Sequence, residues 1–294
     1  MIKLLIGGSP CTFWSIAQTN GRETEAAGMG WELFKNYLIA KEKFEPDFFL
    51  YENNKSAAKA IKEQISCELG VDLMYINSAL VSAQNRQRFY AFNWTVDQPE
   101  DRGIEISDIL EDDVQPIILH NLYGGFKETK PRVFTGKSPT IRTAAGGGHI
   151  PSVLLKGYEI PTTLEEGRKH SRKLTPVECE RLQTLPDGYT KAVSNTQRLR
   201  GIGNGWTAEI IIHILNGALK DIPRDEEIVV LSMYDGIGTG RYCLDKMGFT
   251  NVRYYAYEID EHAMKVAKSN YPDIIHCGDA FDLRNPEWGL TQVS

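Results

Sequence analysis

The sequence predicts an α/β protein with a doubly wound, mostly parallel sheet and a second, smaller domain that is rich in loops. Short apolar runs alternate with helical patterns in both the first and the last third of the chain, as expected for strand–helix–strand units. Between about residues 96 and 170 this periodicity fails, and Gly, Pro and polar residues dominate. A length of 294 residues accommodates one large domain with a smaller one.

The first third alternates apolar strand patterns with amphipathic helical ones. In order, we expect a strand over 2–6, a helix over 28–41, a strand over 47–51 that ends in Glu52-Asn53-Asn54, a helix over 56–69, an extended segment over 72–76 and a strand over 88–92.

Helical periodicity returns after the irregular region, and the last third again alternates. In order, we expect helices over 175–183 and 207–219, a strand over 227–234, a helix over 241–247, a strand over 252–257, a helix over 260–269 and a strand over 274–276.

Composition indicates a globular protein without a membrane span or a metal site. The hydrophobic fraction is 41% and the charged fraction 24%, which is ordinary for soluble domains. No apolar run is long enough to span a bilayer, and no signal peptide is evident, so a cytoplasmic protein is expected. The five cysteines are scattered without a CxxC pair, which argues against disulfides and zinc. The net charge of −6 gives no broad footprint for nucleic acid, although a basic groove can lie on an acidic body.

A glycine-rich loop, Asp235 to Gly240, joins a predicted strand to a predicted helix. Its glycines let backbone approach a ligand, and the helix start offers free amides. The next two strands end at Glu258 and Asp279, where carboxylates can hold ribose hydroxyls and an adenine amine. The glycines run GxGxG rather than the GxGxxG of dinucleotide sites. Together these residues predict an adenosine-cofactor site, whereas each alone fits a tight turn or a surface acid.

A second cluster is predicted around Cys11, which follows the first strand and Pro10. The neighbouring strand ends at Glu52, and Gln84, Arg86 and Arg88 alternate along an extended segment. A thiol, a carboxyl and two guanidinium groups at one sheet edge would favour the thiolate and bind a polar heterocycle. The alternatives are a buried cysteine, a helix cap and a solvated strand face.

Taken together, the motifs resemble those of the DNA cytosine-5 methyltransferases. The resemblance covers most of the chain, and "LSMYDG" is most like the de novo branch. The matching segments are "GGSPC" (nucleophile), "ENN" (glutamate), "QNRQR", "SPTIRTAAGGGH" (recognition), "RKLTPVECERLQTLPDGY", "RGIGNGW", and the cofactor segments "VLSMYDGIGTG", "YEID" and "GDAFDL".

The order of these motifs departs from the family pattern, in which the cofactor motifs precede the Pro-Cys motif. Here they follow it, so the sequence resembles a circularly permuted member of the S-adenosylmethionine-dependent methyltransferase fold. We expect residues 1–95 to form the catalytic half, 96–190 the target recognition domain, and 191–294 the last helix, the joint and the cofactor half. Other departures are Thr12 after Pro-Cys, the lack of Arg-Gly before the first helix, and Ser232 in place of an acid.

The resemblance implies base flipping and covalent catalysis on cytosine in double-stranded DNA. Cys11 would attack C6, Glu52 would hold N3 and the amine, Arg88 would hold O2, and Arg86 would support the loop or a phosphate. Substrate contacts are expected from Ser9, Pro10, Asn53, Gln84, Arg142 and Thr143. The cofactor S-adenosyl-L-methionine would lie against Tyr234, Asp235, Gly236, Gly238, Thr239, Gly240, Glu258, Ile259, Asp279, Ala280, Asn204 and Trp206.

Three alternatives stay open. The same chemistry can act on RNA such as tRNA, or the chain can be a non-catalytic regulatory relative. A dinucleotide oxidoreductase is disfavoured by the glycine spacing. A bacterial or phage-encoded enzyme, for example a restriction companion, fits the pattern, and the sequence fixes neither the recognition site nor the oligomeric state.

Overall fold

The computed structural model describes residues 1–16, 21–123, 128–143 and 150–290. It divides into two compact units. The large-sheet unit comprises Met1–Ile76, Gln87–Gln98 and Ile211–Ser294, and the small-sheet unit comprises Asn77–Arg86 and Pro99–Ile210.

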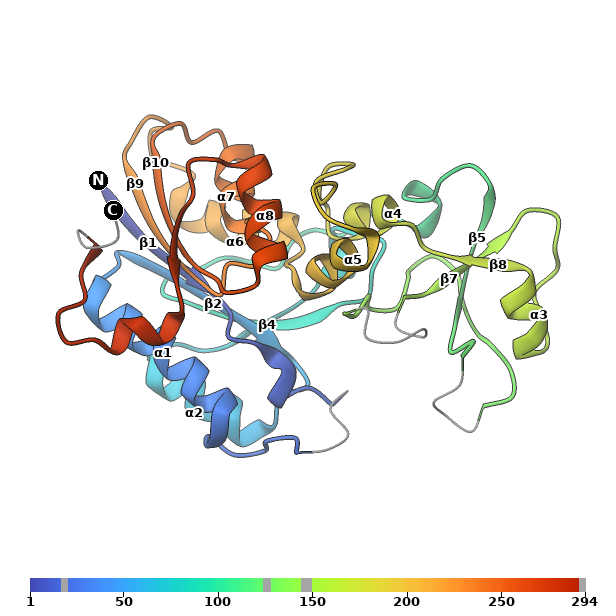
Figure 1. Ribbon diagram of the computed structural model, residues 1–294, viewed down its shortest axis with the longest axis horizontal. Helices are drawn as coiled ribbons and strands as arrows, with labels where there is room; N and C mark the ends of the chain where they lie inside the picture. The colour runs from blue at the N-terminus through green and yellow to red at the C-terminus, as the bar shows by residue number, and fades with distance from the viewer. Residues whose placement is uncertain (17–20, 124–127, 144–149, 291–294) are drawn as a thin grey trace. The chain divides into compact units, whose positions relative to one another are not determined.

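The large-sheet unit is built on a seven-stranded sheet in the order β11-β10-β9-β1-β2-β4-β3 (Figure 1). Strands β11, β10, β9, β1 and β2 pair in parallel, and β4 pairs antiparallel with β2. The predicted α/β class with a mostly parallel sheet is therefore confirmed. The strands are β1 (Ile2–Gly7), β2 (Phe48–Asn54), β3 (Met74–Asn77), β4 (Gln87–Phe92), β9 (Ile228–Met233), β10 (Val252–Tyr257) and β11 (Ile275–Gly278).

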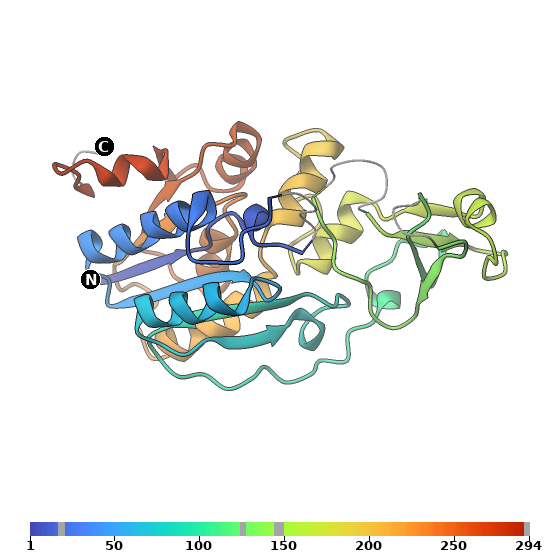
Figure 2. The same cartoon turned by 90° about the horizontal axis from the view of Figure 1, so that it is seen from below.

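Helices cover both faces of this sheet. Helices α1 (Gly28–Phe44) and α2 (Lys59–Leu69) lie on one face, which Figure 2 turns toward the viewer, and α6 (Ala208–Leu219), α7 (Thr239–Lys246) and α8 (Glu261–Asn270) lie on the other. Side chains alternate along each strand. In β1, Leu5 therefore joins the core cluster under α1 and α2, whereas Leu4 and Ile6 are buried toward the opposite face.

Helix α2 begins three residues later than the expected start at residue 56. The side chain of Asn54 accepts a hydrogen bond from the backbone amide of Ser56 at 3.0 Å, and this Asx turn competes with helix formation. The helix then buries Ile61, Ile65 and Leu69, spaced four residues apart, and closes at Gly70 with a φ of 70°.

The small-sheet unit contains an antiparallel sheet in the order β6-β5-β7-β8, where we expected mainly loops. Three of its strands have only three or four residues, and Pro116 interrupts the fourth, so no alternating pattern is long enough to predict them. The elements are β5 (Val114–His120), β6 (Arg132–Phe134), β7 (Ser152–Leu155), α3 (Leu164–Lys169), β8 (Ser171–Lys173), α4 (Pro176–Leu182) and α5 (Asn195–Asn204).

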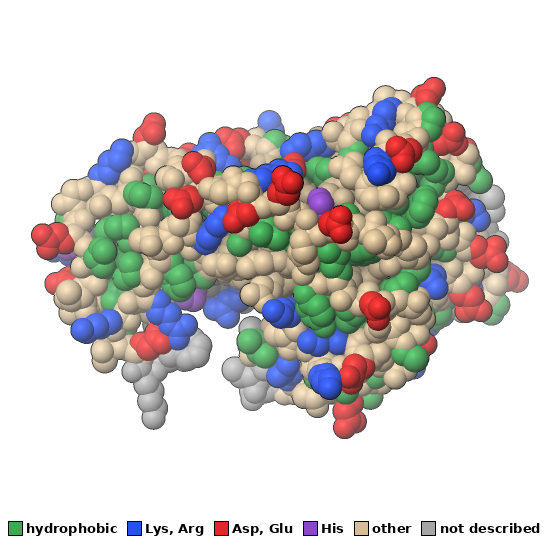
Figure 3. Space-filling model, turned by 180° about the vertical axis from the view of Figure 1, so that it is seen from behind, with side chains coloured by type: hydrophobic (Ala, Val, Ile, Leu, Met, Phe, Trp, Pro, Cys, Tyr) green, Lys and Arg blue, Asp and Glu red, His purple; other side chains and the backbone are tan. Residues whose placement is uncertain are grey.

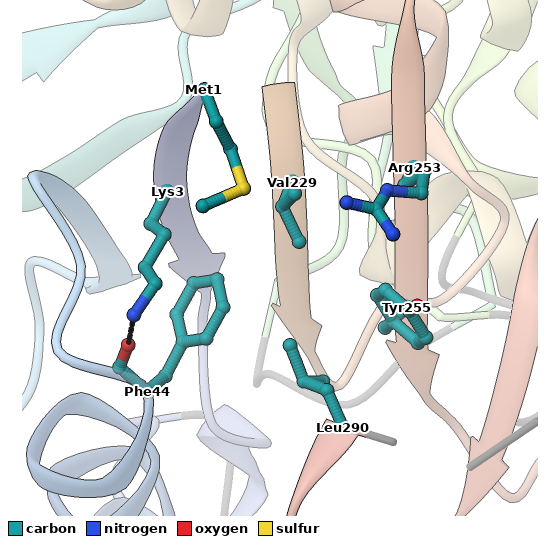
Figure 4. Close-up of a pocket in the computed structure, with 7 residues that line it drawn as sticks. All are labelled: Met1, Lys3, Phe44, Val229, Arg253, Tyr255 and Leu290. Carbon is teal, nitrogen blue, oxygen red and sulfur yellow. Dashed lines mark hydrogen bonds between the residues drawn. The ribbon is translucent and has the colours of Figure 1, made fainter. Parts of the chain in front are cut away.

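The surface and one cavity add limits on function. Acidic and basic side chains are interspersed on the face shown in Figure 3. Figure 4 shows an apolar cavity beside Phe44, where Lys3 donates to the Phe44 carbonyl at 3.1 Å. It is lined by Lys3, Val229 and Arg253 from the first halves of their strands, so it is separate from the predicted site at the carboxyl ends.

Within the described ranges, no helix has the length and apolar character needed to cross a membrane. The same residues contain no group of three or more potential metal ligands.

Candidate active site

The carboxyl ends of five parallel strands meet at one edge of the large sheet. Cys11 follows β1, Glu52 lies near the end of β2, Asp235 follows β9, Glu258 follows β10 and Asp279 follows β11. Ligands of open α/β sheets bind at this edge. Cys11, Glu52 and the three acids of the predicted cofactor site therefore belong to the same edge of one sheet.

Glu52 and Arg88 form an ion pair at this edge. Register places Arg88, near the start of β4, beside the end of β2. The Arg88 Nε and the Glu52 Oε1 are 3.0 Å apart, and the two side chains are 13% and 12% exposed. Partial removal of water strengthens such a pair. The arrangement fixes a carboxylate and a guanidinium in one orientation, ready for a planar ligand with donors and acceptors.

Gly8 allows the Glu52 carboxylate to lie close to the loop that leads to Cys11. A Cβ atom on Gly8 would lie 2.6 Å from the Glu52 carbonyl oxygen and 3.1 Å from its Oε2. Only glycine permits this approach. Gly8 was not among the predicted site residues, although "GGSPC" contains it.

A buried hydrogen-bond network holds the residues just before Cys11. The Ser9 and Tyr51 hydroxyls are 2.7 Å apart, and Asn53 Nδ2 donates to the Ser9 carbonyl at 2.9 Å. Burial raises the pKa of Tyr51, so its hydroxyl stays neutral. Ser9 and Asn53, expected to contact substrate, are 4% and 1% exposed, and these contacts position the loop. Pro10 is exposed at its turn.

The segment after Cys11 is anchored by contacts among Trp14, Arg22 and Glu23, none of which was predicted as a site residue. Cys11 is half-buried and starts a short 3-10 helix, Cys11–Phe13. The buried Trp14 donates from Nε1 to Glu23 at 3.1 Å, and Glu23 also accepts the Gly30 amide. Arg22 donates to the Trp14 carbonyl at 3.2 Å. The loop after Cys11 lacks the Arg-Gly pair that the resemblance leads one to expect before the first helix. Residues 17–20 of this loop lie outside the described residues.

The glycine-rich loop after β9 has the backbone that its glycines predict. Gly236 and Gly238 have φ values of 63° and 78°, and Tyr234 has 59°. The Tyr234 hydroxyl donates to the Leu33 carbonyl at 2.7 Å. A Cβ on Gly236 would meet nothing within 4 Å, whereas Gly240 packs against Tyr254. The loop thus leaves open space beside Gly236.

Two acids frame this loop. The Glu258 carboxylate accepts the amides of Gly236 and Ile259, each at 2.8 Å, so its orientation is fixed. Ile259 is 69% exposed and offers an apolar surface at the same edge. Asp279 is exposed and caps the short helix that begins at the buried Ala280.

The loop also holds two buried oxygen atoms without hydrogen-bond partners, Asp235 Oδ2 and Thr239 Oγ1. Buried polar atoms are normally paired, so a missing partner indicates a place for a ligand group. Acids for ribose, an exposed apolar side chain for a base and a free carboxylate oxygen for a cationic amine fit S-adenosyl-L-methionine.

Gln84 and Arg86 belong to the small-sheet unit, whereas Arg88 belongs to the large-sheet unit. The single extended segment expected through all three residues is interrupted, because β4 begins only at Gln87. Arg86 is 4% exposed and donates to the carbonyls of Ile141, Gly203 and Gly205 at 2.9–3.1 Å. Gln84 is fully buried. These contacts give both side chains a positioning role.

The positioned segment contains Arg142 and Thr143, the expected base-reading residues. Gln84 Oε1 accepts the amide of Ile141 at 2.9 Å. A Cβ on Gly203 would lie 2.6–2.7 Å from the backbone of Arg142 and Thr143, so the segment packs directly on α5. Residues 144–149, the glycine-rich end of the recognition motif, lie outside the described ranges.

Asn204 and Trp206 also lie in the small-sheet unit, at the end of α5. Asn204 is exposed and Trp206 is half-buried. Their contribution to cofactor binding stays a prediction.

Comparisons with known proteins agree with these motifs. The family model described as C-5 cytosine-specific DNA methylase matches residues 1–122 and 127–220. The chain is 26% identical over 76% of its length to DNA (cytosine-5)-methyltransferase DRM2 of Oryza sativa subsp. japonica, and spans only 39% of that protein. It is 27% identical to the Type II methyltransferase M.NlaX of Neisseria lactamica, over 71% of this chain and 73% of that one.

A solved structure supports the fold. The S. pombe Dnmt2 methyltransferase superimposes with a TM-score of 0.50 at 18% identity, covering 74% of this chain and 77% of that one. The family model covers well over half of the sequence. The chain belongs to the C-5 cytosine-specific DNA methylase family.

Proposed function

We propose that the protein transfers a methyl group from S-adenosyl-L-methionine to C5 of a cytosine in duplex DNA. The observation that carries the proposal is the Glu52–Arg88 pair, whose carboxylate lies against Gly8 in the loop that leads to Cys11. The acid-bearing cofactor loop belongs to the same sheet edge. This arrangement offers a nucleophile, a cytosine-binding carboxylate and a methyl-donor site together.

The chemistry requires activation of C5, which is a weak nucleophile in cytosine. The Cys11 thiolate forms a bond to C6, the C5–C6 π electrons shift to the C4–C5 bond, and the C4–N3 π electrons are taken up at N3 with the proton that Glu52 holds there, so that C5 becomes a nucleophilic enamine carbon. Arg88 donates to O2 and balances the charge that develops there. Bound S-adenosyl-L-methionine supplies the electrophilic methyl group that C5 accepts. Loss of the C5 proton to a base restores the double bond and expels the Cys11 thiolate.

Access to C6 requires that the target base leave the duplex. We assign recognition of the flanking sequence to the small-sheet unit, with Arg142 and Thr143 as contacts in the major groove. The relatives named Type II methyltransferases support a restriction companion as the biological role.

We further propose that the chain is circularly permuted relative to the usual family order. The family model matches the region up to residue 220, which contains the nucleophile and recognition motifs. The cofactor loop lies beyond that match, yet β9 pairs in parallel with β1 in the middle of the sheet. A cofactor half that follows the catalytic half in sequence accounts for both observations.

Covalent trapping tests this function. Duplex DNA containing 5-fluorocytosine should form a stable adduct with the wild type in the presence of cofactor, because fluorine at C5 blocks release of the thiolate. Cys11→Ser should abolish the adduct. Cys67→Ser is the matched control, because Cys67 is exposed on α2, and it should react like the wild type.

The substrate class is tested by competition between duplex DNA and tRNA for the label of a methyl-labelled cofactor. Label in DNA supports the proposal, and label in tRNA alone assigns RNA as the substrate.

In the trapping experiment, an adduct with Cys11→Ser equal to that of the wild type would refute the covalent mechanism.

A further inference from the structure

The segment that leads to Arg142 is paired with the segment that contains Gln84. The Ser138 amide donates to the Ala83 carbonyl at 2.7 Å, and the Asn85 amide donates to the Ser138 carbonyl at 2.8 Å. Gln84 forms a parallel bridge with Ser138 between these two bonds. All of these residues belong to the small-sheet unit. Backbone hydrogen bonds therefore fix the start of the segment that carries Arg142.

Two side chains then hold Ile141, the residue before Arg142, at both of its backbone groups. Gln84 Oε1 accepts the Ile141 amide at 2.9 Å, and Arg86 Nη1 donates to the Ile141 carbonyl at 3.1 Å. Ile141 is 1% exposed, so water cannot replace either partner. On the other side, a Cβ on Gly203 would lie 2.6 Å from the carbonyl carbon of Arg142. The backbone of Arg142 is thus held by hydrogen bonds and by close packing.

The hydrogen bond to Ile141 is the contact of Gln84 that nothing else replaces. The Gln84 amide donates to the Leu182 carbonyl at 3.1 Å, but that carbonyl also accepts the Ser82 hydroxyl at 2.6 Å. Its contact with Gln183 Oε1 is long, at 3.4 Å. Within the described residues, the Ile141 amide has Gln84 as its partner and no second acceptor. Because an unpartnered buried amide is costly, removing the Gln84 side chain acts mainly on Ile141.

The guanidinium of Arg142 is available to a ligand. Arg142 is half-buried, and no described residue forms an ion pair or a hydrogen bond with its side chain. A guanidinium presents a planar fork of donors. In the major groove this fork matches the O6 and N7 acceptors of guanine, whereas adenine presents a donor beside N7. A fork on a fixed backbone can make that distinction, because its direction is set before DNA binds.

We propose that Arg142 recognises a guanine in the sequence around the target cytosine, and that Gln84 is a positioning residue that sets this specificity through Ile141. The assignment rests on the proposed function, since base preference is observed through methylation of DNA. It names the base that the small-sheet unit recognises and the buried side chain on which recognition depends.

Methylation of a duplex DNA library, in which the base pairs around one cytosine are randomised, tests the proposal. Bisulfite sequencing at an early time gives the methylation of every sequence in one pool. All sequences compete for the same enzyme, so the ratio of two methylation levels equals the ratio of their kcat/KM values. The fraction of folded enzyme cancels in this ratio. A change in the ratio therefore reports base recognition and not stability.

The wild type should prefer guanine at one fixed position near the cytosine. Arg142→Ala should lower this preference about tenfold, because the bidentate contact is lost. Gln84→Met leaves the Ile141 amide unpartnered and should lower the preference about fivefold. Gln84→Glu keeps an acceptor for that amide but cannot donate to Leu182, so it should retain most of the preference.

Thr207→Val is the matched control from the same buried network. Thr207 is 2% exposed, donates to Gln183 Oε1 at 2.8 Å, and has its hydroxyl 2.8 Å from that of Ser78. The substitution removes two buried hydrogen bonds, as Gln84→Met does, but neither involves Ile141. Thr207→Val should therefore reduce stability and keep the wild-type base preference.

The possible failures are distinguishable. If the wild type methylates no DNA, the proposed function fails, and this assignment fails with it. If the wild type methylates DNA without a preference for guanine, or if Arg142→Ala keeps that preference, the assignment alone is overturned. The role of Gln84 is refuted if Gln84→Met retains the wild-type preference, or if Thr207→Val lowers it equally.

Discussion

Replacing Asp235 by Asn should stabilise the ligand-free protein at neutral pH. Burial raises the pKa of Asp235 from 3.8 to about 6, so the ionised form is disfavoured in the folded state. The resulting loss of folding stability is absent below a pH of 3.8, the pKa of Asp235 in the unfolded chain. It grows as the pH rises from there to about 6, the pKa in the folded protein. A raised pKa of about two units corresponds to about 3 kcal/mol at pH 7.5 and about half of that at pH 5.

The Asn side chain keeps the structural contacts and removes the charge. Its carbonyl oxygen can accept the same two bonds from Ser232 and Tyr254. The free energy of unfolding should therefore exceed that of the wild type by up to about 3 kcal/mol at pH 7.5.

Urea denaturation of both proteins without ligand, at pH 5 and pH 7.5, measures this difference. Asp245→Asn serves as the control, because its carboxylate is exposed and its removal should give no pH-dependent difference. An Asp235→Asn variant that is no more stable than the wild type at pH 7.5, or equally stabilised at both pH values, would refute the reasoning.

Three other substitutions test the positioning contacts. Gly8→Ala places a Cβ 2.6 Å from the Glu52 carbonyl oxygen; methyl transfer should fall at least a hundredfold while S-adenosylhomocysteine affinity is unchanged, and unaltered transfer would contradict the assigned contact. Arg86→Met removes the donor to three carbonyls and should lower the free energy of unfolding by about 3 kcal/mol, measured by urea denaturation; a loss below 1 kcal/mol would assign Arg86 another role. Trp14→Phe leaves Glu23 without one donor and should speed amide exchange in the loop after Cys11, with global stability reduced by about 1 kcal/mol; unchanged exchange would show that Trp14 does not anchor the loop.

The sequence was informative where strands are long and apolar. All strands of the large sheet were expected from continuous or alternating apolar runs, with bounds within a few residues. The four-stranded sheet of the small-sheet unit was not expected, because β6 and β8 have three residues each. Their stability comes from packing around residues such as Ile118 and Val153, which a local pattern does not reveal.

In the candidate site, too, some features were predicted from the sequence and others were not. Glu52 was selected because it ends a strand and Arg88 because it alternates with Gln84 and Arg86 along the chain, and the structure pairs the two side chains. The burial of Gln84 and Arg86 was not predicted, because alternation in an extended segment does not tell which unit a side chain enters. Arg22 and Glu23 were missed for another reason: their contacts with Trp14 depend on how the loop folds back.

The pairing of β1 with β9 bears on the proposed circular permutation, because it brings together the loops that follow these two strands. The loop that contains Cys11 and the loop that contains Asp235 follow two paired strands, β1 and β9, whose register runs from Ile2 opposite Ile228 to Gly7 opposite Met233. At the end of that pairing, a Cβ on Gly7 would lie 2.6 Å from the Met233 carbonyl oxygen, so glycine sets how closely the two loops approach. This distance depends on strand register and on one missing side chain, and no covalent link between the two strands contributes to it. Under the proposed permutation, a chain in which β9 follows β1 instead of preceding it would therefore form the same edge, provided that the parallel register is kept.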